Sequence, residues 1–336
     1  MNSKARKVLK YVLTLGIAVV LVWLVFRKVD WADFWTGLKS CNYWLIIATM
    51  AIQWLVTYLR GNRWRIMMLP LSREITRRES YDAYAVCYLS NMVIPRSGEV
   101  VRCGMIADTR KASFEGSLGT VVIERTWDMV CLVLTCIPLL FAGGFRDFIV
   151  EKMLVPAAES RRGLLIALAL VTVALIAAVV LLYVKRESVS RTKAGAKVVG
   201  FCKGLVDGVK AVFKMDRKWA FIAYSVLIWV GYWLCSLLTI RAFPQTDALT
   251  GFDALFLMIV GSLGWIVPVQ GGFGVYHFLV AMTLVPIYGI PYETGLIFAT
   301  ISHESQIVQM LLCGIISLIS WAIYKKHVLN RNKQTI

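Results

Sequence analysis

Two polar interruptions in long apolar stretches hold the residues of this sequence that could do chemistry. The first, residues 91–102, reads NMVIPRSGEVVR, and the second, residues 268–277, reads PVQGGFGVYH. Inside a bilayer, backbone broken by Pro and Gly is tolerated only where its freed N–H and C=O groups are buried in protein or line a wet cavity. Because paired breaks in corresponding halves of a chain are typical of transport sites, we predict a binding site at these two places.

The first break offers groups that bind an anion. A short helix is predicted to begin after Pro95, with Ser97 as its cap and Arg96 beside its positive dipole end. Helix N-termini and guanidinium groups both bind phosphate, so we predict a site for a lipid phosphate. The residues assigned to it are Asn91, Arg96, Ser97, Glu99 and Arg102.

The second break offers bare backbone beside a few polar side chains. Gly271, Gly272 and Gly274 allow the close approach of a lipid headgroup, with Gln270 and His277 on either side of them. A structural alternative is that these glycines only permit tight packing and turning of the chain.

A group of ionisable residues lies inside a later apolar run. Glu124, Arg125 and Asp128 fall within little more than one helical turn, and Glu124 and Asp128 share one face. Ionisable groups in a membrane span usually face the bundle interior and serve function. We assign the three to the substrate site; the alternative is a structural ion pair with Arg96 or Arg102.

Histidines accompany the second break and the last apolar run. His303 and Glu304 lie in that run, and His277 follows the break; all three are assigned to the site. A histidine titrates near neutral pH and could couple transport to protons, whereas the alternative is a hydrogen-bonded packing residue. No His/Asp cluster with metal-ligand spacing is evident, and the eight cysteines contain no C-x-x-C pair. We therefore predict no metal, no other cofactor and no catalytic residue.

Composition defines the class of protein that must position these groups. Of 336 residues, 58% are hydrophobic and 17% charged, against about 45–50% and about 25% in soluble domains. The apolar runs are too long and continuous for barrel strands, so we predict an all-α polytopic membrane protein. The net charge of +17 does not indicate a nucleic-acid partner, because the basic residues sit at the ends of apolar runs.

The apolar runs predict six full spans and two re-entrant helical hairpins. The spans are residues 8–26, 43–59, 114–141, 164–184, 219–240 and 294–324, and the hairpins are 80–107 and 252–287. The first run also resembles a signal peptide, but its length and the lack of a small-residue cleavage site predict a retained span. The segment 80–94 is too short to cross comfortably, and a crossing there would invert every later loop.

The basic residues orient this topology. It places 28 of the 37 Lys and Arg residues on the cytoplasmic side and 8 outside. Such an excess follows the positive-inside rule, so we predict an inner (cytoplasmic) membrane protein with both termini in the cytoplasm. Part of the excess is expected to touch an anionic lipid surface.

The same order of elements then occurs twice, in opposite orientations. Residues 1–141 form the first repeat, 142–162 an external loop, 163–324 the second repeat and 325–336 a cytoplasmic tail. Each repeat includes an amphipathic interfacial helix, predicted at 31–38 and at 193–214. Inverted repeats with a site at the midplane are a common plan of secondary transporters.

The motifs also resemble those of a known family. N-x-x-x-P-R-x-G-E-x-x-R at 91–102, E-R-x-x-D at 124–128 and P-x-x-G-G-x-G at 268–274 are similar to successive signatures of the lysylphosphatidylglycerol synthase transmembrane-domain family. The resemblance covers nearly the whole chain, and the first motif is the most specific. Gln270 stands where relatives commonly have Pro, and His277 where a Glu is usual.

This resemblance implies a lipid flippase or a related lipid-handling membrane protein. The soluble aminoacyl-transferase domain that some relatives carry is missing, so we do not expect an enzyme that aminoacylates lipid. The prediction is a transporter that moves a phospholipid or a lipid-linked headgroup, with the lipid and the oligomeric state left open. The alternatives are a membrane enzyme that modifies lipid headgroups and a membrane assembly factor.

Overall fold

The computed structural model describes residues 29–141 and 210–334 apart from 268, together with 208 and several positions between 16 and 27. The described residues form helices and no strands. The predicted span 164–184, the external loop 142–162 and most of the segments 8–26 and 193–214 lie outside them.

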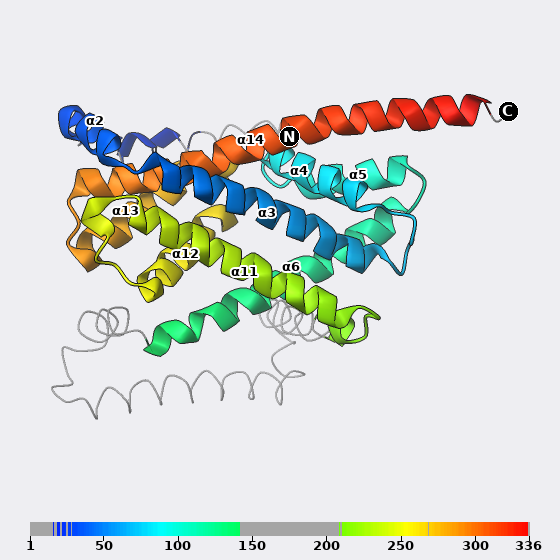
Figure 1. The fold of residues 1–336 in the computed structure, drawn as a ribbon, viewed down its shortest axis with the longest axis horizontal. Coiled ribbons are helices and arrows are strands. Elements are labelled where there is room, and N and C mark those ends of the chain that lie inside the picture. The colour runs from blue at the N-terminus through cyan, green and yellow to red at the C-terminus, as the bar shows by residue number, and fades with distance from the viewer. Residues whose placement is uncertain are drawn as a thin grey trace, which may run out of the picture. The chain divides into compact units, whose positions relative to one another are not determined.

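The chain forms two compact units. One combines Met1–Val122 with Trp219–Ile336, and the other is Ile123–Lys218. The helix α6 (Phe114–Cys136) runs across the division, and the short 3₁₀ helix η1 (Pro138–Phe141) follows it in the second unit. Figure 1 shows the elements of the first unit, which holds both breaks.

The first break separates two helices that pack as a hairpin. Helix α4 (Arg77–Val93) begins with a capping box, in which Thr76 and Glu79 satisfy each other's backbone N–H groups. Helix α5 (Gly98–Asp108) returns along α4. At the open end, Lys111 Nζ donates to both carboxylate oxygens of Glu79 at 2.8 and 2.9 Å. Both limbs therefore end at the same place, as the sequence predicted for a helical hairpin.

The tip of this first hairpin requires a glycine. A Cβ atom at Gly98 would lie 2.0 Å from the carbonyl oxygen of Cys87, which is far inside van der Waals contact. The backbone of α5 therefore approaches α4 more closely than any side chain allows.

The second break has the same architecture. Helix α12 (Gly251–Ile266) begins with a capping box of Thr250 and Asp253, and α13 (Val275–Tyr288) returns beside it. The Tyr288 hydroxyl donates to Asp253 Oδ1 at 2.9 Å and joins the open ends. The 3₁₀ helix η4 (Gln270–Gly272) lies between the two limbs.

Three long helices complete the first unit. They are α3 (Tyr43–Met68), α11 (Lys218–Arg241) and α14 (Tyr292–Gln334), the last drawn orange to red in Figure 1. Helix α14 packs against both hairpins, through α4 and α13, and also contacts α3 and α2 (Trp31–Ser40). A short 3₁₀ helix, η3 (Pro244–Thr246), follows α11.

Four described helical segments are long and apolar enough to cross a membrane by length and composition. They are Tyr43–Met68, Lys218–Arg241, Gln270–Tyr288 and Tyr292–Lys326. Three correspond to predicted spans; the fourth is the second limb of the second predicted hairpin. The predicted span 114–141 is helical over Phe114–Cys136 but does not meet the same criteria. The described part of the chain is thus all-helical, and the protein is a multi-pass membrane protein.

One predicted span was too short. The helix predicted at 43–59 continues to Met68, because its second half packs in the core around Trp64 and Met68. Arg60 and Arg63 follow the predicted end of this helix and therefore counted among the 28 cytoplasmic basic residues, but they lie inside the helix and are buried. The amphipathic helix predicted at 31–38 is confirmed as α2, whose N-cap Asp30 accepts from two backbone N–H groups.

Candidate functional site

The side chain of Asn91, and not that of Ser97, caps the first backbone N–H group of α5. Ser97 occupies the N-cap position but makes no side-chain cap bond, because its hydroxyl donates to the Ser90 carbonyl at 2.9 Å. Asn91 Oδ1 accepts from the Gly98 N–H at 2.8 Å instead. The predicted capping role of Ser97 is therefore wrong.

Arg96 connects the two breaks. It is exposed, and its backbone adopts a φ of 63°, a left-handed conformation that costs a non-glycine residue roughly 1–2 kcal/mol. Its Nη2 atom donates to the carbonyl oxygen of Ile266, at the end of α12, at 3.2 Å. Helix α4 also contacts η4. The two interruptions, far apart in the sequence, thus lie side by side.

Arg102 lies apart from this exposed tip. It is fully buried, and its guanidinium carbon is 4.7 Å from the ring centroids of both Trp64 and Tyr84. Cation–π contacts of this kind offset part of the cost of burying the charge. Glu99, on the first turn of α5, is half-buried. The prediction grouped Arg96 and Arg102 in one phosphate site, whereas the fold gives them different surroundings.

Two further buried arginines, Arg60 and Arg63, were not among the residues assigned to the site from the sequence. Arg60 Nη1 donates to the Tyr232 hydroxyl at 2.8 Å, and Arg63 Nη1 to the Ser225 hydroxyl at 3.4 Å. Both bonds join α3 to α11. Their three-residue spacing places the two arginines on one helical face, the signal that could have distinguished them from flanking charges.

The second break uses its glycines for backbone conformation. Gly271, Gly272 and Gly274 have φ values of 56°, 75° and 76°, which L-amino acids rarely adopt. The bend directs the Gly271 carbonyl oxygen to Nε2 of His303, 2.8 Å away on α14. The predicted turning role of these glycines is confirmed, and their use in binding a headgroup stays a prediction.

His277, His303 and Glu304 come together next to this bend. Glu304 Oε1 lies 3.0 Å from His303 Nδ1 and 3.5 Å from His277 Nε2. Among the described residues, neither amide atom of Gln270 has a hydrogen-bond partner, although the side chain is 91% buried. The fold therefore gathers the predicted residues of the second break and the last helix into one place.

Glu124, Arg125 and Asp128 lie on α6 in the second compact unit. Glu124 is fully buried, Asp128 is half-buried and Arg125 is exposed. The i, i+4 relation of the two carboxylates is confirmed by the helix.

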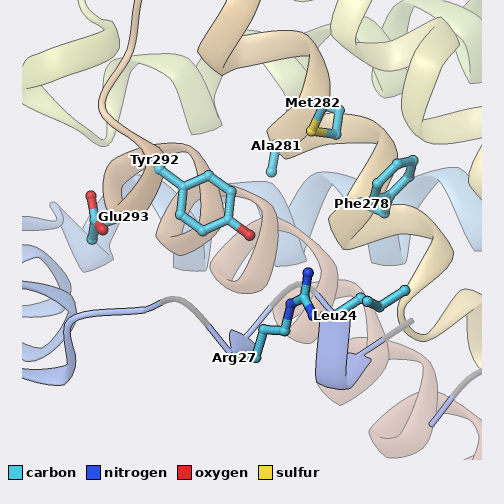
Figure 2. Close-up of a pocket in the computed structure, with 7 residues that line it drawn as sticks. All are labelled: Leu24, Arg27, Phe278, Ala281, Met282, Tyr292 and Glu293. Carbon is cyan, nitrogen blue, oxygen red and sulfur yellow. The ribbon is translucent and has the colours of Figure 1, made fainter. Parts of the chain in front are cut away.

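A pocket of about 500 Å³ opens elsewhere in the first unit. Figure 2 shows the Arg27 guanidinium and the Tyr292 ring directed toward the same space, which α13 borders. The lining residues are Leu24, Arg27, Phe278, Ala281, Met282, Tyr292 and Glu293. The walls are mostly apolar, with one cationic and one anionic side chain, and none of these residues was assigned to the site from the sequence.

An ion pair closes the open end of the first hairpin. Burial of Glu79 raises its pKa, but hydrogen bonds from Lys111, Thr76 and Tyr324 outweigh this effect and hold the pKa below its ordinary value. Burial lowers the pKa of Lys111, but the hydrogen bond and charge of Glu79 hold it above its ordinary value. Each group thus favours the charged form of the other.

Comparison with known proteins agrees with this architecture. Residues 11–314 match the family model described as the lysylphosphatidylglycerol synthase TM region. No curated protein and no solved structure matches the sequence. The match covers both hairpins, the buried arginines and the histidine cluster, and it includes only the membrane region of that synthase. This chain belongs to the lysylphosphatidylglycerol synthase transmembrane family.

Proposed function

We propose that this protein moves a phospholipid or a lipid-linked headgroup across the cytoplasmic membrane without modifying it. The observation that carries the proposal is the hydrogen bond from Arg96 to the carbonyl of Ile266, which joins the tips of two broken hairpins. Hairpins that enter a bilayer from opposite sides meet at their tips near the midplane. Broken helices meeting at that depth are how transporters of inverted-repeat design build their sites.

Arg96 supplies the anion-binding group of this site. An arginine has five N–H donors, so its bond to Ile266 leaves donors for a phosphate. The positive dipole end of α5, which begins two residues after Arg96, adds to the attraction. Glu99, on the first turn of α5, is proposed to receive a headgroup amine or to balance the arginines.

The remaining charges of the bundle fit transport better than a structural role. A charge at the centre of a membrane helix costs roughly 2.5–3.5 kcal/mol on insertion scales. Arg60, Arg63 and Arg102 are all at least 91% buried. A membrane assembly factor has no need of such charges, whereas a path for a charged headgroup does.

The test uses purified protein in vesicles that contain a fluorescent phospholipid, with dithionite quenching to report leaflet exchange. Wild-type protein is expected to make both leaflets accessible, and Arg96→Ala to abolish this while staying folded. Arg110→Ala is the matched control, because Arg110 is also exposed and has a φ of 61°. Both variants place an alanine at a left-handed backbone position and carry the same backbone cost. A difference in exchange between them therefore reports the loss of the Arg96 guanidinium from its place at the tip.

Three outcomes would oppose the proposal. Normal exchange by folded Arg96→Ala excludes Arg96 as the phosphate ligand, and equal loss in both variants indicates a general effect on folding. Mass spectrometry of the recovered lipid covers the alternative function, since a chemically altered headgroup would identify an enzyme.

A further inference from the structure

Three side chains with metal-ligating atoms converge beside the second break. His277 comes from α13, and His303 and Glu304 come from α14. One ligand atom from each lies within 4.8 Å of the others. Sequence spacing did not reveal this group, because two separate helices supply it.

We propose that His277, His303 and Glu304 bind a divalent transition-metal ion, for which Zn²⁺ is the best chemical match. Imidazole nitrogen and carboxylate oxygen are both common zinc ligands. Metal–ligand bonds of about 2.0–2.2 Å place the atoms of a tetrahedral site roughly 3.3 Å apart. The separations of Glu304 Oε1 from the two histidine nitrogens, 3.0 and 3.5 Å, fall on either side of that value.

The Gly271 carbonyl orients His303 for this role. A carbonyl oxygen can only accept, so Nε2 of His303, 2.8 Å away, carries the ring proton. The Nδ1 lone pair then faces the Glu304 carboxylate at 3.0 Å, which places two acceptors against each other. A cation between them removes the repulsion, and so does one additional proton on the pair. A ligating histidine whose other N–H donates to a backbone carbonyl is the usual arrangement in metal sites.

The surroundings allow an ion to enter and then hold it. His277 and His303 are 3% and 0% exposed, and the rings of Trp265, Phe273 and Tyr276 surround His303. Glu304 is 38% exposed, so one side of the cluster is open. Three protein ligands leave a fourth position for water or a substrate oxygen.

A bound cation would cross-link α13 to α14 and, through His303, fix the bend at Gly271. It would therefore restrain the second hairpin at its tip. This inference does not depend on lipid transport, because binding of the ion is measured on the purified protein alone.

The experiment titrates the chelator-treated full chain in detergent with Co²⁺, whose visible absorption reports coordination, and then displaces it with Zn²⁺. We expect one Co²⁺ per chain and full displacement. His277→Ala and Glu304→Gln should each weaken binding by at least about tenfold, the effect already seen on removing groups that only support ligands. His327→Ala is the control: His327 is the third histidine of the chain and lies just beyond the span Tyr292–Lys326.

Several results would overturn the proposal. Absence of saturable Co²⁺ binding, or unchanged affinity in Glu304→Gln, would show that the His303–Glu304 pair holds a proton and not a metal. Loss of binding in His327→Ala would place the ion elsewhere. If His277→Ala fails to fold, Glu304→Gln decides the question, because its partly exposed side chain is replaced by one of the same shape.

Discussion

The Nη2 atom of Arg96 lies 3.2 Å from the carbonyl oxygen of Ile266, so the tip of the first hairpin is bonded to the tip of the second. A hydrogen bond also holds the two limbs of each hairpin together at the end away from the tip. Lys111 donates to Glu79 in the first hairpin, and Tyr288 donates to Asp253 in the second. The two hairpins thus form one framework with its polar tips in contact.

Arg96→Lys is expected to restore only part of the lipid exchange that Arg96→Ala abolishes. A lysine ammonium keeps the charge but loses the planar fork that binds phosphate through two N–H groups. The vesicle assay with dithionite quenching measures the rate, with Arg110→Lys as the control. Full wild-type exchange in Arg96→Lys would show that charge alone is sufficient and would contradict bidentate binding.

Gly98→Ala should destabilise the protein by about 1–3 kcal/mol, the usual cost of overpacking. The new Cβ would lie 2.0 Å from the Cys87 carbonyl oxygen, so α5 must move away from α4. Gly104→Ala, on the same helix, meets nothing within 4 Å and should be neutral or slightly stabilising. Thermal unfolding in detergent compares the two, and an equal effect at both positions would contradict the close approach at the tip.

Lys111→Met should destabilise the first hairpin by about 1–3 kcal/mol, because Glu79 keeps its bonds to Thr76 and Tyr324 but loses a charged partner. Glu79 is 1% exposed, so water cannot replace that partner. Thermal unfolding near neutral pH measures the change, with Lys326→Met, whose side chain is exposed, as the control. Unchanged stability would mean that the ion pair contributes nothing net.

The contribution of Glu79 to stability should depend on pH with a defined sign. Its folded pKa lies below the ordinary value of 4.5, so the stabilisation is complete above that value and is lost as the pH falls through the lower, folded pKa. For Lys111, whose pKa is raised, stabilisation is complete below its ordinary 10.5 and is lost at higher pH. The difference in melting temperature between wild type and Glu79→Gln should therefore be largest between these limits. If the difference in melting temperature instead grew as the pH fell, the sign assigned to the Glu79 contribution would be wrong. Glu115→Gln, at an exposed position, is the control.

Tags inserted near Glu79 and Thr109 should report the same compartment, because the Glu79–Lys111 bond holds the hairpin ends together. If the repeats are inverted, tags near Thr250 and Gly289 should both report the compartment on the opposite side of the membrane. Protease protection or impermeant thiol labelling of intact cells measures this. If the two tags of either pair lay on opposite sides of the membrane, the re-entrant arrangement would be excluded. If all four tags lay on the same side, the inversion of the two repeats would be excluded.

Met282→Trp should slow lipid exchange if the pocket of about 500 Å³ lies on the lipid path, because the larger ring fills it. Leu312→Trp is a matched control, since both residues lie on helices and are about half exposed. The vesicle assay decides, and equal rates in the two variants would exclude the pocket.

The local sequence was sufficient to predict the class of protein, its family and the positions of both breaks. Hydrophobic runs, Pro and Gly act on the nearest few residues, so they specify where helices form and where they stop. The capping residues Thr76 and Thr250 add the same kind of local signal, each followed three residues later by an acidic side chain. The φ values at Gly271, Gly272 and Gly274 likewise follow from residue type.

Only the tertiary structure decided which polar groups share an environment. From the sequence, Arg60 and Arg63 are interpreted as charges that flank a span. In the fold they are buried and donate to Tyr232 and Ser225 of α11. Ser97 has the right residue type for a cap and occupies the N-cap position, but Asn91 on the other limb of the hairpin makes the capping hydrogen bond. His277 and His303 meet because α13 packs on α14. A side chain's partner depends on which distant helix packs against it, and the spacing of residues along one helix does not contain that information.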